Sequence, residues 1–365
     1  MPSYSSPISE GRTKPLIAVT GAAGYVGLNT CYKLLQAGYD IVTVDNYSTG
    51  REDGLNQLRK LQEELHLPGK IVMMVKMDIS ENKNKLRNLF KDTRPDTVIH
   101  LAAKIVVEQS DKERTMYYRN NIIGTKNVIR AMRIANVKNC IFSSTAAVYG
   151  GQPKNGLSFQ EDDVVDKNMA SNYYALTKMY DEDSLRKWQE EYSTNLIINR
   201  FFNLAGAGGP NKEFGYNVWP PTHLMPSAVA AAMGLLSGFE YKCPMGLNTR
   251  DGSTIRDYVH VEDIADALVT EVGYLGKRNG VGASEIINLG SGEGQTTKEI
   301  VGSAAELISG DFPMTKGKVR PNESPSLVAN ITKANALLGW NPKHSLTDMI
   351  MDLQIWFGGE TFKDL

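Results

Sequence analysis

The chain has 365 residues, 41% of them hydrophobic, and a formal net charge of −1 at pH 7. This length can bury a substantial core in one large domain or two intimate ones. The balance of 40 basic and 41 acidic residues gives no electrostatic reason to expect nucleic acid or an anionic membrane as a partner. No apolar run reaches the length of a transmembrane helix, so we expect a soluble protein.

The cysteines and the first residues indicate where the protein works. Cys31, Cys140 and Cys243 lie far apart, without the spacing of metal ligands or of a disulfide framework. We therefore expect no metal site and a location in the reducing cytoplasm. Residues 1–14 are polar and rich in Ser and Pro, and they lack the apolar core of a signal peptide. They are predicted to be a disordered tail.

Short apolar runs alternate with amphipathic segments through the first two hundred residues. Strands are expected at 16–20, 40–45, 70–76, 97–103, 139–144 and 195–202, and helices at 25–37, 52–65, 80–91, 114–135 and 172–192. Strands that alternate with helices require right-handed crossovers and a parallel sheet covered on both faces. The fold class predicted is α/β, with a Rossmann-type doubly wound parallel sheet.

After residue 202 the pattern changes. A long loop rich in glycine and proline, 206–221, is expected to be functional because connections are usually shorter. A short helix (225–238), a strand (286–289), a helix (297–307) and an extended segment leading into a helix (257–264) follow. We expect a first domain of residues 15–202, to which 257–276 returns, and a smaller C-terminal domain formed mainly by 203–365.

Three glycines follow the first strand at intervals of three residues. Gly21 permits a sharp turn, Gly24 lets a pyrophosphate approach the backbone, and Gly27 lets the following helix pack closely. The free N–H groups at the start of that helix favour phosphate. Asp45 ends the next apolar run, about 20 residues on, where an acid can hold a ribose diol. Because its charge would repel a 2′-phosphate, we expect NAD rather than NADP.

Tyr174 and Lys178 are four residues apart on a predicted helix, so their side chains share one face. A nearby ammonium favours the phenolate form of tyrosine, whose ordinary pKa is about 10, and makes it usable as a base. The hydroxyl of Thr145, just past the fifth strand, could share the proton. A surface Tyr/Lys pair is common, but a dinucleotide turn upstream favours catalysis.

These features together resemble the extended short-chain dehydrogenase/reductase superfamily, and within it the UDP-glucose 4-epimerase family. The resemblance covers about residues 17–352. The motifs that carry it include, besides those above, Asp45-Asn46, His100-Leu101-Ala102-Ala103, Phe142 to Gly150, Arg200-Phe201-Phe202-Asn203, His223-Leu224-Met225-Pro226, Asp251 to His260, Asn288 to Gly292 and Leu338-Gly339-Trp340.

The resemblance implies roles for individual residues and for both domains, 15–202 binding NAD and 203–365 mainly the UDP-sugar. The cofactor would contact Gly21, Gly24, Tyr25, Val26, Gly27, Asp45, Asn46, Asp78, Ile79, Leu101, Ala102, Ala103, Lys104, Asn121, Ser143, Tyr174, Lys178 and Phe201. The substrate would contact Lys104, Thr145, Tyr174, Phe201, Asn203, His223, Leu224, Arg256, Arg320, Glu323 and Leu327. Either arginine could instead be a structural ion-pair partner.

Departures from the related families narrow the function. Related sugar-nucleotide dehydratases carry an Asp-Glu pair after the active-site threonine, whereas this chain has Ala146 and Ala147. Neither alanine can move a proton, which favours epimerisation over elimination. Leu327 occupies a position where the family varies between bulky and small residues beside the sugar, so the exact sugar stays open.

We therefore expect an NAD-dependent epimerase that interconverts UDP-glucose and UDP-galactose through a transient 4-keto intermediate, with Tyr174, Lys178 and Thr145 as its catalytic residues. A UDP-pentose or UDP-N-acetylhexosamine 4-epimerase would use the same residues. A catalytically silent NAD-binding regulator is a further alternative, against which the intact catalytic residues count. The helices expected at 114–135 and 172–192 carry apolar residues on more than one face, which predicts a homodimer.

Overall fold

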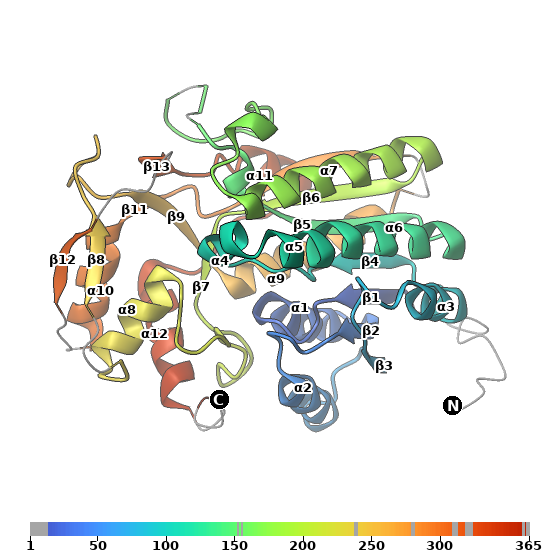
Figure 1. Cartoon of the computed structure of the whole chain (residues 1–365). Coiled ribbons are helices and arrows are strands. Elements are labelled where there is room, and N and C mark those ends of the chain that lie inside the picture. Colours follow the sequence, from blue (N-terminus) through green and yellow to red (C-terminus); the bar gives the residue numbers. More distant parts are fainter. Residues whose placement is uncertain are drawn as a thin grey trace. The chain divides into compact units, whose positions relative to one another are not determined.

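Seven strands form the main sheet of the computed structural model, which describes residues 14–151, 153–154, 156–236, 240–278, 282–308, 313–317, 324–359 and 362 (Figure 1). They are β1 (Leu16–Thr20), β2 (Asp40–Asp45), β3 (Ile71–Lys76), β4 (Thr97–His100), β5 (Asn139–Thr145), β6 (Asn195–Phe201) and β10 (Ser284–Leu289). Their order is β10-β6-β5-β4-β1-β2-β3. The strand order thus reverses at β1: β2 and β3 lie on one side of it, and β4, β5, β6 and β10 lie on the other. β1 pairs in parallel with both of its neighbours, β2 and β4. The predicted doubly wound α/β fold is confirmed.

Helices connect these strands. They are α1 (Tyr25–Gln36), α2 (Glu52–Glu64), α3 (Lys83–Thr93), α4 (Val107–Lys112), α5 (Arg114–Tyr117), α6 (Gly124–Ala135), α7 (Tyr173–Tyr192) and α9 (Val261–Gly276). The side chain of Asn172 caps α7 by accepting the backbone N–H of Ala175 at 2.8 Å, so the chain begins this helix directly before Tyr173.

One face of the sheet packs against α3, α6 and α7. Phe90, Met132 and Trp188 from these three helices meet β-strand residues such as Val98 and Ile198 in one buried cluster. These apolar residues recur at helical spacing on each helix, and burying them drives the helices onto the sheet.

The helix expected at 114–135 is interrupted. The chain forms α5, then a π-helical stretch over Tyr118–Ile123, and then α6. The wider π turn carries the buried side chain of Asn121, which bonds to its surroundings rather than facing solvent. The short helix α4 was not predicted. The fourth strand also ends early, at His100 rather than Ala103.

The other strands and helices form smaller layers. A four-stranded sheet contains β7 (Asn203–Ala205), β9 (Ile255–His260), β11 (Gly294–Thr296) and β13 (Ser326–Leu327), and β8 (Tyr241–Pro244) pairs with β12 (Met314–Gly317). The helices here are α8 (Leu224–Ala232), α10 (Thr297–Ile308), α11 (Thr332–Leu338) and α12 (Leu346–Gly358). The helix expected at 225–238 ends earlier because Gly234, at φ 71°, turns the chain.

The described residues divide into two units. The first comprises Met1–Ser144, Asn172–Asn199 and Leu268–Ile286, and the second Thr145–Ser171, Arg200–Ala267 and Ile287–Leu365. This differs from the expected boundary at 202, since 145–171 lies in the second unit and the returning segment is 268–286 rather than 257–276. The reason is packing: Tyr149 and Phe159 join Phe202 and Ala329 in one apolar cluster of the second unit.

The start of the described chain is tied to the first unit, and the three cysteines are buried. Of the tail expected at 1–14, residues 1–13 lie outside the described residues, whereas the Lys14 ammonium donates to the carbonyl oxygen of Pro68. Cys31, Cys140 and Cys243 are buried free thiols. Among the helices of the described residues, none is both long enough and apolar enough to cross a membrane.

Candidate functional site

The glycine turn has the shape of a phosphate cradle. Gly21 adopts φ +74°, and a Cβ there would lie 2.6 Å from the backbone nitrogen of Ala102. At Gly27 a Cβ would lie 2.1 Å from the carbonyl oxygen of Gly21, so only glycine permits α1 to start this close to the turn. A Cβ at Gly24 would lie 3.3 Å from the carbonyl oxygen of Gly21, and no other atom of the described residues would lie within 4 Å of it. The turn is therefore closed at two glycines and open at the third, with Tyr25 and Val26 opening α1 beside it.

Asp45, at the end of β2, is fixed by backbone donors. Its carboxylate accepts the N–H of Ala23 at 3.0 Å and the N–H of Tyr47 at 2.7 Å. Burial raises the pKa of Asp45, while these N–H groups oppose the rise. The acid that sequence spacing linked to the glycine turn thus contacts that turn directly, through Ala23.

A polar cavity of about 750 Å³ lies in the first unit and is lined by Asn46, Asp78 and Lys104 among others. The Asn46 amide donates to Asp78 at 2.8 Å, and Asp78 also accepts the hydroxyl of Ser80 at 2.6 Å. Three residues expected to bind the cofactor are therefore brought to one cavity. Ile79, expected beside them, is 5% exposed, and its side chain packs in the core.

Lys104 is held both at its backbone and at its ammonium group. Its backbone N–H donates to Asn121 at 2.8 Å, and its ammonium donates to the hydroxyl of Ser48 at 3.0 Å. The amide of Asn121 donates in turn to the Thr177 hydroxyl at 3.0 Å. This links the segment after β4, in which Leu101, Ala102 and Ala103 are half-buried, to α7.

The Tyr174/Lys178 pair lies on α7 as expected. Tyr174 is 9% exposed and Lys178 2%. The Lys178 ammonium donates to the carbonyl oxygen of Ser143 at 2.6 Å, so β5 fixes its position. Burial lowers the pKa of Lys178. The surface-pair interpretation is therefore excluded, because both side chains are largely withdrawn from solvent.

Apart from Lys104 and Tyr174, which lie in the first unit, the described residues expected to bind substrate lie in the second unit. Thr145 accepts the N–H of Ala147 at 3.2 Å, and the Asn203 amide donates to the carbonyl oxygen of Asp257 at 3.0 Å. Phe201 is buried at the end of β6. Arg256 donates to the carbonyl oxygen of Ser324 at 3.0 Å.

The remaining substrate candidates are divided between described and undescribed segments. His223 and Leu224 mark the start of α8, where the His223 ring bonds to the Tyr216 hydroxyl at 2.7 Å. Leu327 on β13 is the register partner of Arg256 on β9 and packs, half-buried, against the apolar cluster that contains Phe159. Arg320 and Glu323 lie outside the described residues.

Sequence reasoning missed the residues that position the site. Ser48 and Thr177 hold Lys104 and Asn121, yet a serine in a loop and a threonine inside a helix carry no motif of their own. Thr177 could have been noticed because it lies three residues after Tyr174, on the same side of α7.

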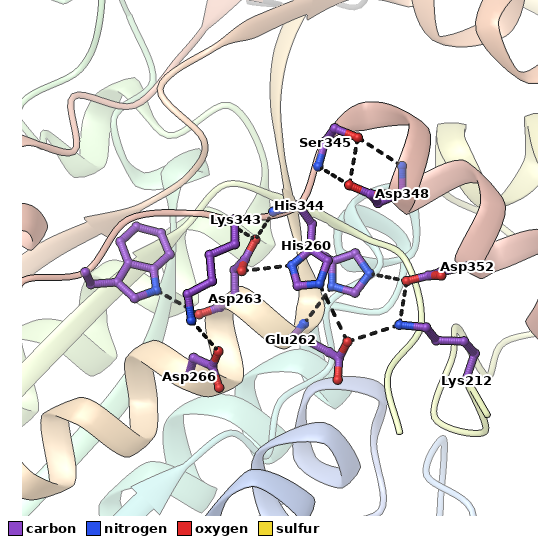
Figure 2. A network of polar contacts seen from close by, with 11 residues as sticks. Lys212, His260, Glu262, Asp263, Asp266, Lys343, His344, Ser345, Asp348 and Asp352 are labelled. Atoms are coloured by element: carbon purple, nitrogen blue, oxygen red, sulfur yellow. Dashed lines mark hydrogen bonds and ion pairs between the residues drawn. The ribbon is translucent and has the colours of Figure 1, made fainter. Parts of the chain in front are cut away.

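A second polar cluster, in the second unit, surrounds two stacked histidines (Figure 2). The rings of His260 and His344 are 4.1 Å apart between centroids and 21° from parallel. His260 contacts Asp352 at 3.0 Å and accepts the N–H of Glu262 at 3.0 Å. The Lys212 ammonium lies 2.8 Å from Asp352 and 3.2 Å from Glu262.

This cluster does not suit a metal ion, although His260, Glu262 and His344 offer ligand atoms within 4.8 Å of one another. The lone pairs of imidazole nitrogens lie in the ring plane, so those of two stacked rings lie in nearly parallel planes and do not converge on one ion. Both nitrogens of His260 are already engaged, and the Lys212 ammonium already supplies positive charge. We assign the cluster to stability.

We expect His344→Gln to lower the thermal midpoint more at pH 6 than at pH 8.5. A hydrogen bond to Asp263 at 2.9 Å raises the pKa of His344 above its ordinary value. The stability that this bond adds is fully present below about pH 6.5, the pKa of histidine in the unfolded chain. It is lost as the pH rises through the higher pKa of His344 in the folded protein. Lys343→Gln, which alters an exposed neighbour, should show no such pH dependence. An equal loss at both pH values in His344→Gln would contradict this assignment.

Comparisons with known proteins agree with the geometry. The profile of the NAD dependent epimerase/dehydratase family matches residues 17–290. A UDP-glucose 4-epimerase from Rhizobium leguminosarum bv. trifolii is 33% identical over 342 residues, which cover 93% of this chain and 96% of that protein.

Solved structures show the same relationship. The UDP-glucose 4-epimerase from Brucella ovis in complex with NAD superposes with a TM-score of 0.83 at 32% identity, covering 94% of this chain and 98% of that one. The enzyme from Bifidobacterium longum in complex with NAD+ and UDP gives 0.84 at 27% identity, covering 95% and 99%. The chain belongs to the NAD dependent epimerase/dehydratase family.

Proposed function

We propose that this chain is an NAD-dependent UDP-glucose 4-epimerase that interconverts UDP-glucose and UDP-galactose through a transient 4-keto intermediate. The observation that carries the proposal is the placement of Tyr174 and Lys178 one turn apart on α7, with the Lys178 ammonium fixed by Ser143. Family membership and the names of the relatives supply the reaction class.

The residues of the glycine turn fit NAD. The open side of Gly24 leaves room for a diphosphate at the start of α1, and the carboxylate of Asp45 disfavours a 2′-phosphate. The chemistry that NAD would supply here when bound is reversible hydride transfer, which leaves the reaction redox-neutral overall. The protein must therefore retain the cofactor throughout a turnover.

We propose that the Tyr174 phenolate takes the proton of the sugar's 4-hydroxyl and later returns it, and that Lys178 supplies the positive charge that favours the phenolate. Thr145 assists by hydrogen bonding to the same hydroxyl. Ala146 and Ala147 offer no acid or base for elimination, which supports epimerisation.

We assign NAD binding to the first unit and UDP-sugar binding to the second. The assigned cofactor contacts are Gly21, Gly24, Tyr25, Val26, Gly27, Asp45, Asn46, Asp78, Leu101, Ala102, Ala103, Lys104, Asn121 and Ser143, with Ile79 contributing through its backbone. The assigned substrate contacts are Phe201, Asn203, His223, Leu224 and Arg256.

We also propose a cytoplasmic location, which the three buried free thiols support.

The proposal is tested with the purified protein as isolated. Denaturation should release NAD(H), and incubation of the intact protein with UDP-galactose should yield UDP-glucose. Release of NADP as the main nucleotide would overturn the assignment of Asp45. Bound NAD without turnover would favour a silent regulator.

We expect Leu327→Ser to relax discrimination against N-acetylated sugars. A leucine beside the sugar's 2-substituent would overpack an acetamido group at a cost of about 1–3 kcal/mol, a factor of about 5–150. The ratio of kcat/KM for UDP-galactose to that for UDP-N-acetylgalactosamine should therefore fall in the serine variant. Leu327→Met, which nearly conserves volume, should change the ratio little. An unchanged ratio in the serine variant would assign Leu327 to core packing alone.

We propose a homodimer built on the helices of the first unit. Tyr118 and Tyr180, on the adjacent π stretch and α7, are 43% and 45% exposed, more than large aromatic side chains usually are. Tyr180→Glu should convert the dimer to a monomer in light scattering at micromolar concentration. Leu157→Glu, at a 79% exposed position of the second unit, should leave the dimer intact. A wild-type monomer would contradict the proposal.

A further inference from the structure

Lys178 is a buried cation whose visible contacts carry no negative charge. Its ammonium donates to the Ser143 carbonyl oxygen at 2.6 Å and lies 4.6 Å from the centroid of the Phe142 ring. A carbonyl and a ring face attract a cation but do not neutralise it. Since burial penalises the charged form, an ammonium that must stay protonated here needs a nearby anion.

Two buried acids follow Lys178 on α7, and one of them is already engaged. The carboxylate of Glu182 accepts the hydroxyl of Ser144 at 2.5 Å and lies 3.4 Å from the guanidinium of Arg186. A hydroxyl donor and a cation therefore compensate the charge of Glu182.

Asp181 is in the opposite situation. Its side chain is 1% exposed, and neither of its oxygens meets the geometry of a full hydrogen bond among the described residues. The donor that faces it is the neutral hydroxyl of Thr125, which also bonds to His100 at 3.0 Å. It lies three residues after Lys178, and therefore on the same side of α7. Burial raises the pKa of Asp181, and the charge of Lys178 opposes that rise. A buried carboxylate that faces only a shared neutral hydroxyl among the described residues is costly and rare, which indicates that it is kept for its charge.

We propose that Asp181 is a positioning residue for the reaction: its carboxylate is the counter-charge that keeps Lys178 protonated beside the Tyr174 phenolate. This inference rests on the proposed function. The other groups that face the pair are Glu182 on α7, Thr125 and Lys126 on α6, and His100 on β4. His100 bonds to Thr20 at 2.7 Å and to Thr125 at 3.0 Å, and burial lowers its pKa to about 3, so it adds no charge.

Asp181→Asn tests the proposal, because it removes the charge and nearly preserves the shape. We expect the alkaline limb of the kcat–pH profile to move to lower pH by about one unit or more, since Lys178 loses its proton more easily. We also compare thermal midpoints by subtracting the wild-type value from the variant value at each pH. This difference should increase from pH 6 to pH 9. As the pH rises, the wild type loses stability because the buried Asp181 becomes charged. The variant gains stability because the buried Lys178 loses its charge. Both changes raise the midpoint of the variant relative to that of the wild type.

Asp183→Asn is the matched control. The Asp183 carboxylate lies on the same helix, is 39% exposed and pairs with Arg186 at the surface. Asp183→Asn should therefore leave the alkaline limb of the kcat–pH profile in place, and its effect on the thermal midpoint should not change with pH. An active wild type whose alkaline limb is unmoved by Asp181→Asn overturns the inference alone. A constant midpoint offset with activity lost in parallel also overturns it, because that is the signature of a purely structural residue. A wild type without epimerase turnover overturns the proposed function, and the inference with it.

Discussion

Tyr174→Phe should lower kcat for UDP-galactose by about 10²–10⁴-fold, the range that general acid–base groups contribute. The change deletes one hydroxyl and keeps the ring, which is 9% exposed on α7. Folding and bound NAD should therefore be nearly unchanged. Steady-state kinetics, together with quantification of the nucleotide released on denaturation, check both parts.

The neighbouring residue provides the control. Tyr173→Phe removes a hydroxyl from the first position of α7, where the ring packs against Arg114, and should leave kcat within a few-fold of wild type. If Tyr174→Phe kept more than about a tenth of the wild-type rate, another residue would be the base.

Gly27→Ala should abolish stable retention of NAD. A methyl group there would lie 2.1 Å from the carbonyl oxygen of Gly21 and 2.7 Å from the backbone of Ala22. Backbone atoms cannot rotate away, so α1 must move off the turn and the phosphate cradle opens. Overpacking of this kind costs about 1–3 kcal/mol, and we expect a lower thermal midpoint as well as empty protein after purification.

Gly302→Ala separates this effect from the general consequences of replacing a helical glycine. A Cβ at Gly302, inside α10, would meet no atom of the described residues within 4 Å. Alanine should therefore stabilise the protein by about 0.5–1 kcal/mol and leave the NAD content unchanged. NAD retained at the wild-type level in Gly27→Ala would show that the turn tolerates the displacement.

The alternation of strands and helices could be predicted because each buried strand of a parallel sheet is a short apolar run, and each covering helix carries an apolar stripe. The π turn at Tyr118–Ile123 could not, because it depends on the tertiary contacts of Asn121 rather than on local propensity. The same holds for the unit boundary. Phe159 pairs with Ala329, 170 positions later, and no local pattern reports so distant a contact.

In the candidate site, too, local spacing could be predicted from the sequence, whereas tertiary contacts could not. Spacing alone linked Asp45 to the glycine turn and Tyr174 to Lys178, because a strand–turn–helix unit and a helical turn fix those distances. The contact of Lys178 with Ser143 depends instead on the packing of α7 beside β5. The burial of the Asp181 carboxylate could not be predicted either, since one acid among several on a charged helix gives no sign of burial.

The proposed reaction requires that hydride leave C4 of the sugar and return to the same carbon while the protein retains both NAD and the nucleotide sugar. UDP-galactose carrying deuterium at C4 tests this most directly, with mass and NMR analysis of the UDP-glucose formed in ordinary water. We predict that the deuterium is retained at C4 of the product. Product that has exchanged its C4 deuterium for solvent hydrogen would rule out this reaction, because it would mean that C4 loses a proton rather than a hydride.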